Sequence, residues 1–142
     1  MTAFTSSDEV TRIELVMVQN LINTTGKTVY VDRENSIDAA TAISGSGPAY
    51  VFFFMQSMMT AAREMGFSRS EAELLVSQTF KGAVDLYNKS NLSCEEWIQK
   101  VASKGGTTEA ALRSFEENKV YADIIAAAQA ALHRAVELGQ KD

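Results

Sequence analysis

The sequence has 142 residues, of which 46% are hydrophobic, and a formal net charge of −5. This length fits one ordinary domain, or one domain with a piece of another, and supplies enough apolar residues for a core. The acidic balance argues against a nucleic-acid-binding surface, because no basic stripe offsets it. Cys94 is the single cysteine, so no internal disulfide is possible and nothing indicates an oxidising compartment.

No segment predicts targeting or membrane insertion. Residues 1–10 lack the basic stretch and apolar stretch of a signal peptide. The longest apolar run, residues 48–55, is followed by Gln56 and Ser57 and is far short of a membrane span. We therefore expect a soluble, cytoplasmic protein that contacts neither membranes nor nucleic acids.

The first part of the chain predicts a helix and a strand. Ser6-x-x-Glu9 has the capping-box pattern that opens a helix, residues 10–22 carry apolar side chains at helical spacing, and Gly26 ends it. Residues 27–31, Lys-Thr-Val-Tyr-Val, predict one short strand.

That predicted strand has no predicted partner, because no later segment has strand character. Either it pairs between subunits, or it belongs to a sheet whose other strands are missing. The residues before Glu34 therefore look like the tail of another domain.

From Ser36 onward the chain predicts only helices, which makes the fold class all-α. A short helix from Ser36 must break or kink at Gly45-Ser46-Gly47-Pro48. Gly66 ends the next helix, and the capping boxes Ser68-x-x-Glu71 and Ser93-x-x-Glu96 open the two that follow. These helices and the last two are expected at about 49–65, 69–89, 94–101, 108–117 and 120–138.

The loop Ser103-Lys104-Gly105-Gly106-Thr107-Thr108 directly precedes a strong helix former. A helix N-terminus presents unpaired N–H groups and the positive end of the helix dipole, and the glycines let a ligand approach the backbone. This pattern favours an anion site for a carboxylate or phosphate. The alternative is equally open: a simple turn, with Thr107 or Thr108 as the N-cap of the helix.

Other candidate sites have weaker support. Gly45-Ser46-Gly47-Pro48 fits a kinked helix joint better than a ligand site. The sequence contains neither G-x-G-x-x-G nor a P-loop, so no nucleotide-binding fingerprint is present. His133 has no second histidine or cysteine near it, and we expect no metal site.

The helix around Phe52, Phe53 and Phe54 predicts an oligomer. Three consecutive phenylalanines point around more than half of a helix, and a helix that is apolar nearly all round is buried on all sides. A small monomer rarely achieves such burial.

Three separated motifs, in the same order, carry a resemblance to a known family. They are Asp38-Ala39-x-Thr41-Ala42-x-Ser44-Gly45-Ser46-Gly47-Pro48-Ala49-Tyr50, then Gln78-Thr79 with Gly82-Ala83, and Val101-x-Ser103-x-Gly105-Gly106-Thr107-Thr108. In this combination the sequence closely resembles pyrroline-5-carboxylate reductase over essentially residues 8–139.

The resemblance implies a fold. Enzymes of this family have an N-terminal Rossmann domain and a C-terminal helical bundle, of the type found at the C-terminus of 6-phosphogluconate dehydrogenase, that forms a homodimer through interleaved helices. Residues 1–33 would then be a helix-strand remnant of the Rossmann domain, and residues 34–142 the helical dimerisation and substrate-binding domain. The unpartnered strand is explained if its sheet has been left out.

The resemblance also implies a function and its residues. The family reduces the cyclic imine of 1-pyrroline-5-carboxylate to L-proline with hydride from NADPH or NADH. The backbone N–H groups of Gly106, Thr107 and Thr108 would hold the substrate carboxylate, in a loop that includes Ser103 and Gly105. The Thr108 hydroxyl would hydrogen-bond the ring nitrogen and act as the catalytic group.

The sequence contains no binding motif for the cofactor that this reaction requires. Ser44 and Gly45 would approach the nicotinamide, but without a G-x-G-x-x-G motif there is no dinucleotide cradle. We therefore expect a truncated C-terminal part that is inactive alone. The alternative is a non-catalytic helical dimerisation module that keeps the loop only as a turn.

Overall fold

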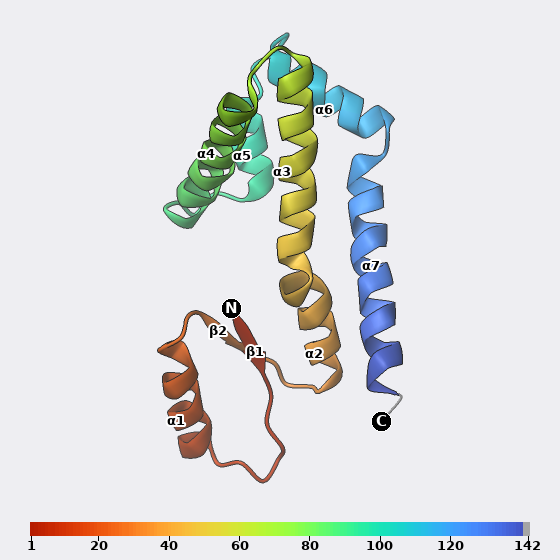
Figure 1. The fold of residues 1–142 in the computed structure, drawn as a ribbon. Coiled ribbons are helices and arrows are strands. Elements are labelled where there is room, and N and C mark those ends of the chain that lie inside the picture. The colour runs from red at the N-terminus through yellow and green to blue at the C-terminus, as the bar shows by residue number, and fades with distance from the viewer. Residues whose placement is uncertain (141–142) are drawn as a thin grey trace. The chain divides into compact units, whose positions relative to one another are not determined.

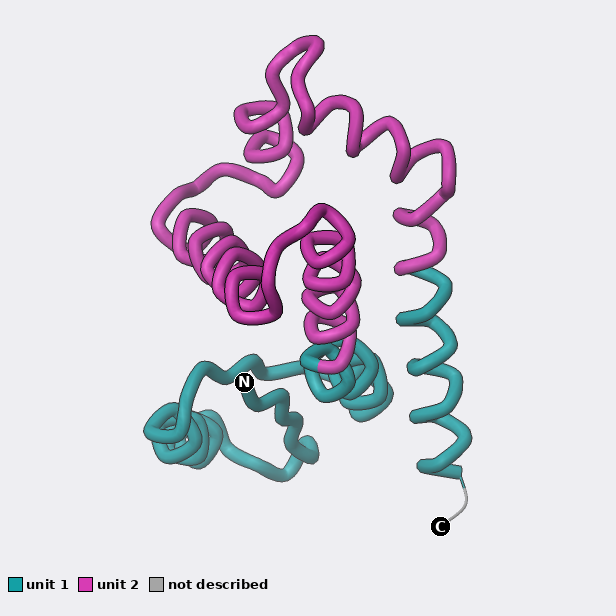
Figure 2. The backbone as a smooth tube through the Cα atoms, turned by 45° about the horizontal axis from the view of Figure 1, so that its top comes forward, with its two compact units in different colours: residues 1–48, 125–142 teal, residues 49–124 magenta. Residues whose placement is uncertain are grey.

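The structure is a computed structural model that describes residues 1–140. Figure 1 shows the fold as helices and a pair of short strands. The chain divides into two units, with residues 49–124 in one and the segments before and after them in the other (Figure 2). The predicted all-α class is confirmed, with the strand pair confined to the first 30 residues.

The predicted strand has a partner within the chain. Strand β2 (Thr28–Tyr30) pairs in parallel with strand β1 (Thr2–Phe4), with Ala3 opposite Val29. The expectation that the strand lacks an internal partner is therefore wrong. Three residues are too few to show an alternating pattern, so β1 gave no signal in the sequence. The rings of Phe4 and Tyr30 meet edge to face with centroids 5.6 Å apart.

Helix α1 (Arg12–Asn23) begins later than predicted. Its N-cap is Thr11, whose hydroxyl accepts from the Glu14 N–H, while the Glu14 carboxylate accepts from the Thr11 N–H at 2.9 Å. The predicted capping box at Ser6 and Glu9 is wrong. The chain turns there, with the Val10 N–H donating to Ser7 O, so Ser6 is not followed by helical residues.

The helix break predicted at Gly45-Ser46-Gly47-Pro48 follows a π-helical turn, which is wider than an α-helical one. Helix α2 (Asn35–Ala40) continues into a π-helical turn, η1 (Thr41–Gly45), and helix α3 (Gly47–Glu64) follows with Pro48 in its first turn. The Thr41 hydroxyl donates to Ile37 O at 2.9 Å, and the Ser46 N–H donates to Thr41 O. A proline has no N–H to donate, so it is tolerated in a first turn, where intrahelical acceptors are lacking.

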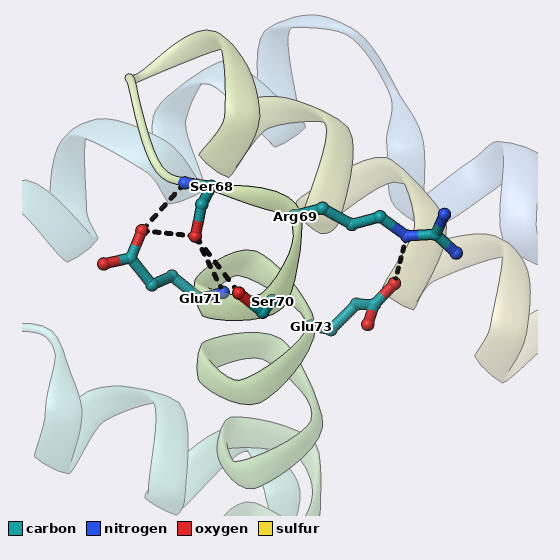
Figure 3. A network of polar contacts seen from close by, with 5 residues as sticks. All are labelled: Ser68, Arg69, Ser70, Glu71 and Glu73. Atoms are coloured by element: carbon teal, nitrogen blue, oxygen red, sulfur yellow. Dashed lines mark hydrogen bonds and ion pairs between the residues drawn. The ribbon is translucent and has the colours of Figure 1, made fainter.

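Helix α4 (Arg69–Asn88) begins as the sequence predicts. Gly66, with φ +103°, ends the preceding helix, and the Ser68 hydroxyl accepts from the Glu71 N–H while the Glu71 carboxylate accepts from the Ser68 N–H at 2.8 Å. Figure 3 shows this box beside an ion pair between Arg69 and Glu73 at 2.7 Å. Both side chains of the pair are exposed, so water and salt screen the attraction and the pair adds little to the stability of the helix.

The remaining helices are α5 (Cys94–Val101), α6 (Thr107–Glu117) and α7 (Val120–Gly139). The predicted box at Ser93 and Glu96 opens α5. Between α4 and α5, the Trp97 indole N–H donates to the Ser90 hydroxyl at 3.0 Å. Asn118 and Lys119 separate α6 from α7, and Lys119 takes a positive φ of 57°.

Few side chains are buried within the described part of the chain. The buried hydrophobic residues are Ala42, Ala72 and Val76, all of modest size. Large apolar side chains lie on the surface instead, among them Phe52 at 66% and Phe53 at 71% exposure. The described helices include none that is long and apolar enough to cross a membrane.

Candidate functional site

The loop between α5 and α6 is a tight turn built around two glycines. Gly105 lies in the left-handed region at φ +74°, where a side chain is strained. The turn closes through the Gly106 N–H, which donates to Ser103 O at 3.0 Å. Gly106 thus has an acceptor for its own amide within the loop.

The structure has no room for a side chain at position 106. A Cβ at this position would lie 2.5 Å from the Ser103 hydroxyl oxygen and 3.0 Å from the Ser103 carbonyl oxygen. The hydroxyl can rotate away, but the carbonyl belongs to the turn that Gly106 itself closes. Any side chain here would therefore displace the Ser103 backbone.

After the loop, the first N–H groups of α6 have no hydrogen-bond acceptor in the part of the chain that the structure describes. The N-cap is Gly106, which has no side chain to accept a hydrogen bond, and the helix begins at Thr107. Among the described residues, no acceptor meets the N–H of Thr107, Thr108 or Glu109. The alternative in which Thr107 or Thr108 is the N-cap is wrong, because both lie inside the helix.

This N-terminus has the geometry of an anion site. Adjacent N–H groups at positions 107 and 108 share the positive end of the helix dipole, and such ends bind carboxylates and phosphates. The side chain of Thr108 is partly exposed and that of Thr107 is exposed, so both are open to a ligand. Ser103 and Gly105 shape the turn that precedes them.

One hydrogen bond of this loop was not predicted from the sequence. The Glu109 carboxylate accepts from the Gly105 N–H at 2.6 Å, spanning the turn from the third residue of α6. A glutamate three residues after the N-cap was the available signal. The pattern went unrecognised because its first position is Gly106 and not a serine or threonine.

Ser44 and Gly45, the predicted cofactor neighbours, lie in the π-helical turn of the other unit. They line a pocket of about 260 Å³ next to strand β1, with Thr2, Ala3, Ile37, Ala40, Thr41 and Met1. None of these side chains is charged. π-Helical turns are frequent at functional sites. A Cβ at Gly45 would make only an ordinary contact with Thr41, at 3.6 Å.

The described residues contain no cluster of histidine, cysteine, aspartate or glutamate that could hold a metal ion. His133 lies in α7 and Cys94 at the start of α5.

Comparison with known proteins identifies the family. The family model described as "Pyrroline-5-carboxylate reductase dimerisation" matches residues 34–138. The chain belongs to the pyrroline-5-carboxylate reductase family. The resemblance carried by the glycine motifs is thereby confirmed, and the matched region includes both the α5–α6 loop and the π-helical turn.

Curated reductases align with most of this chain. The pyrroline-5-carboxylate reductase of Pseudomonas aeruginosa is 41% identical over 121 residues, which are 85% of this chain and 44% of that enzyme. Pyrroline-5-carboxylate reductase 2 of Bacillus subtilis is 34% identical over 140 residues, 99% of this chain and 50% of that enzyme. The chain thus spans about half the length of the curated reductases it matches.

Solved reductase structures share the fold. The reductase of Coxiella burnetii superposes with a TM-score of 0.91 at 33% identity, over 96% of this chain and 50% of that one. The Plasmodium falciparum pyrroline carboxylate reductase, solved with NADP bound, gives a TM-score of 0.85 at 33% identity, over 96% of this chain and 53% of that one. The likeness therefore extends to residues before residue 34, where helix α1 lies.

Proposed function

We propose that this chain is the substrate-binding and dimerisation part of a pyrroline-5-carboxylate reductase, an NAD(P)H-dependent enzyme of proline biosynthesis. The reaction reduces 1-pyrroline-5-carboxylate to L-proline. The supporting observation is the pair of adjacent, unpaired amides at Thr107 and Thr108, following a glycine turn, in a chain of this family.

In this proposal the loop binds the substrate carboxylate. Its two oxygens accept from the N–H groups of Thr107 and Thr108, at the positive end of α6. The Gly106 amide was expected as a third donor, but its bond to Ser103 O assigns it to closing the turn. Ser103 and Gly105 then act by shaping the loop.

The Thr108 hydroxyl is the proposed catalytic group. It hydrogen-bonds the ring nitrogen, orients the C=N bond, and helps supply the proton that the nitrogen gains when the imine is reduced. The hydride that the imine carbon gains comes from the dinucleotide when it is bound. Ser44 and Gly45 would lie beside the nicotinamide, in keeping with the uncharged side chains of their pocket.

The chain by itself is expected to bind the substrate class without turnover. Its sequence has no G-x-G-x-x-G motif, which in dinucleotide-binding domains holds the pyrophosphate. The exposed phenylalanines of α3 support a homodimer built from interleaved helices. Such a dimer would bury side chains that the single chain leaves in water.

Titration with L-proline, the product, tests the substrate loop. In ¹⁵N-labelled protein we expect shifts of the amides at Thr107 and Thr108, whereas pyrrolidine, which lacks the carboxylate, shifts neither. Thr108→Val keeps the backbone donor and removes the hydroxyl, so binding should weaken by a few-fold to about tenfold, and Thr108→Ser should restore it.

Two outcomes would contradict the proposal. If saturating L-proline shifts no amide of residues 105–108, the loop is only a turn and the chain is a non-catalytic dimerisation module. Oxidation of NADPH by the purified chain in the presence of pyrroline-5-carboxylate would instead show a nucleotide site that the sequence does not reveal.

A further inference from the structure

Helix α6 is capped differently from α1, α4 and α5. In those three helices a serine or threonine N-cap accepts from the N–H three residues on, and the glutamate there returns a bond to the N-cap N–H. In α6 the N-cap is Gly106, without a hydroxyl. Glu109 occupies the same third position as those glutamates but bonds one residue further back, to Gly105.

Because Gly106 has no hydroxyl, the third N–H of α6, that of Glu109, stays without a partner among the described residues, along with those of Thr107 and Thr108. In α4, for example, the Ser68 hydroxyl occupies the Glu71 N–H at 3.3 Å. In α6 no described group occupies the N–H of Thr107, Thr108 or Glu109. The glutamate still ties the turn to the helix, but through the amide of a residue that takes no part in the proposed carboxylate site.

The hydrogen bond to Glu109 restrains Gly105, which as a glycine has the most backbone freedom. Gly105 is free to adopt many backbone conformations, and the loop requires φ +74°. A 2.6 Å hydrogen bond to a carboxylate is short and charge-assisted, and it holds the Gly105 N–H against the first turn of α6. The bond from the Gly106 N–H to Ser103 O closes the turn, and the bond from the Gly105 N–H to Glu109 joins the turn to the helix.

We propose that Glu109 is a positioning residue of the substrate loop: by accepting from Gly105 N–H, its carboxylate holds the turn so that the Thr107 and Thr108 amides face the substrate carboxylate. This inference rests on the proposed function. Glu109 does not attract the substrate, because its own charge repels a carboxylate. Positioning and repulsion therefore predict opposite effects when the side chain is removed.

The test compares two substitutions in the ¹⁵N-labelled chain. Glu109→Gln keeps an oxygen acceptor of the same reach, and Glu109→Ala removes it. Without ligand, we expect Gly105 amide exchange to be faster in Glu109→Ala and close to wild type in Glu109→Gln. The apparent dissociation constant for L-proline should rise about tenfold in Glu109→Ala and stay within about threefold in Glu109→Gln.

Glu116→Ala is the matched control, since Glu116 lies in the same helix and its carboxylate has no hydrogen bond in the described part of the chain. This variant should change neither the amide exchange of Gly105 nor the dissociation constant for L-proline. Unchanged amide shifts in α4 show that each variant is folded.

Three results would overturn the proposal: Gly105 exchange that is unaffected by Glu109→Ala, L-proline binding that is equal or tighter in that variant, or a loss in Glu109→Gln as large as in Glu109→Ala. If L-proline shifts no amide of the wild-type loop, the proposed function itself fails. The rate of amide hydrogen exchange at Gly105 then still decides whether Glu109 positions the turn.

Discussion

Gly105 and Gly106 are adjacent, yet each is required for a different reason. Gly105 has open space around it but takes φ +74°, which L side chains rarely adopt. Gly106 has an ordinary backbone conformation, but a Cβ would press on the Ser103 hydroxyl and carbonyl oxygens. A substitution at the first position strains the backbone, and one at the second displaces the turn.

Gly105→Ala should lower the free energy of unfolding by about 1–2 kcal/mol, the cost of a left-handed alanine. Urea unfolding measures the loss. Gly139→Ala is the control, because Gly139 ends α7 without a positive φ and with nothing within 4 Å. Equal stability of the two variants would show that the left-handed turn is absent in solution.

Helix α5 depends on its cap more than the longer helices do. It has eight residues, too few to be stable without capping and packing. Ser93→Ala removes the hydroxyl that accepts from the Glu96 N–H and should cost about 1 kcal/mol of unfolding free energy. Ser77→Ala, within α4, should be close to neutral, because that hydroxyl only bonds back to Leu74 O. A loss no larger for Ser93→Ala than for Ser77→Ala would contradict this assignment.

The capping boxes also predict how stability changes with pH. Bonds from the Thr11 hydroxyl and N–H lower the pKa of Glu14 below 4.5, those from Ser68 do the same for the pKa of Glu71, and the Ser93 N–H and hydroxyl lower the pKa of Glu96. A pKa that is lower in the folded state means that the unfolded chain binds the proton more tightly.

The stabilisation from these three carboxylates is therefore complete above pH 4.5 and is lost as the pH falls through their folded pKa values. Urea midpoints should decrease below pH 4.5, and Glu96→Gln should make that decrease shallower. Glu117→Gln, at the end of α6, should leave this pH dependence unchanged. If Glu96→Gln also left it unchanged, the box at α5 would not form in solution.

Many large apolar side chains of the described residues lie on the surface of the molecule. Its buried hydrophobic residues, within the described chain, are two alanines and a valine, while Phe52, Phe53 and Tyr121 are 66%, 71% and 80% exposed. Contiguous exposed apolar surface marks an interaction site. A groove of about 390 Å³ between α4 and α5 adds to this surface, lined by Ala83, Val84, Leu86, Tyr87, Cys94, Trp97 and Val101.

Phe52→Asp should weaken self-association by about 2 kcal/mol or more, because a charge would replace an aromatic side chain in the proposed dimer interface. Sedimentation equilibrium measures the change, and Phe52→Leu, which keeps an apolar side chain, should remain associated. If the wild-type chain were monomeric, or if both variants associated equally, Phe52 would not lie in the dimer interface.

Much of the helical fold could be predicted from the sequence because its signals are local. The boxes at Ser68 and Ser93 and the stop at Gly66 involve residues within one helical turn, and all three are confirmed. The same pattern failed at Ser6, where Thr11-x-x-Glu14 competes with it a few residues later. The boundary between residues 33 and 34 stays a prediction.

The candidate site was predicted in part. The glycine and threonine motif located the loop, and the anion-site interpretation remains the proposal after the N-cap alternative has failed. The bond from Gly105 to Glu109 was missed, since the capping pattern specifies a side-chain acceptor that glycine lacks. The roles of Thr108, Ser44 and Gly45 stay predictions.

The sequence by itself determined where most helices begin and end, and which loop could bind an anion. Only the tertiary structure decided that β1 pairs with β2, and which amides at the start of α6 stay unpaired. The physical reason is the range of the interactions. Caps and turns depend on neighbouring residues, whereas strand pairing and the direction of a loop's amides depend on the path of the backbone through space.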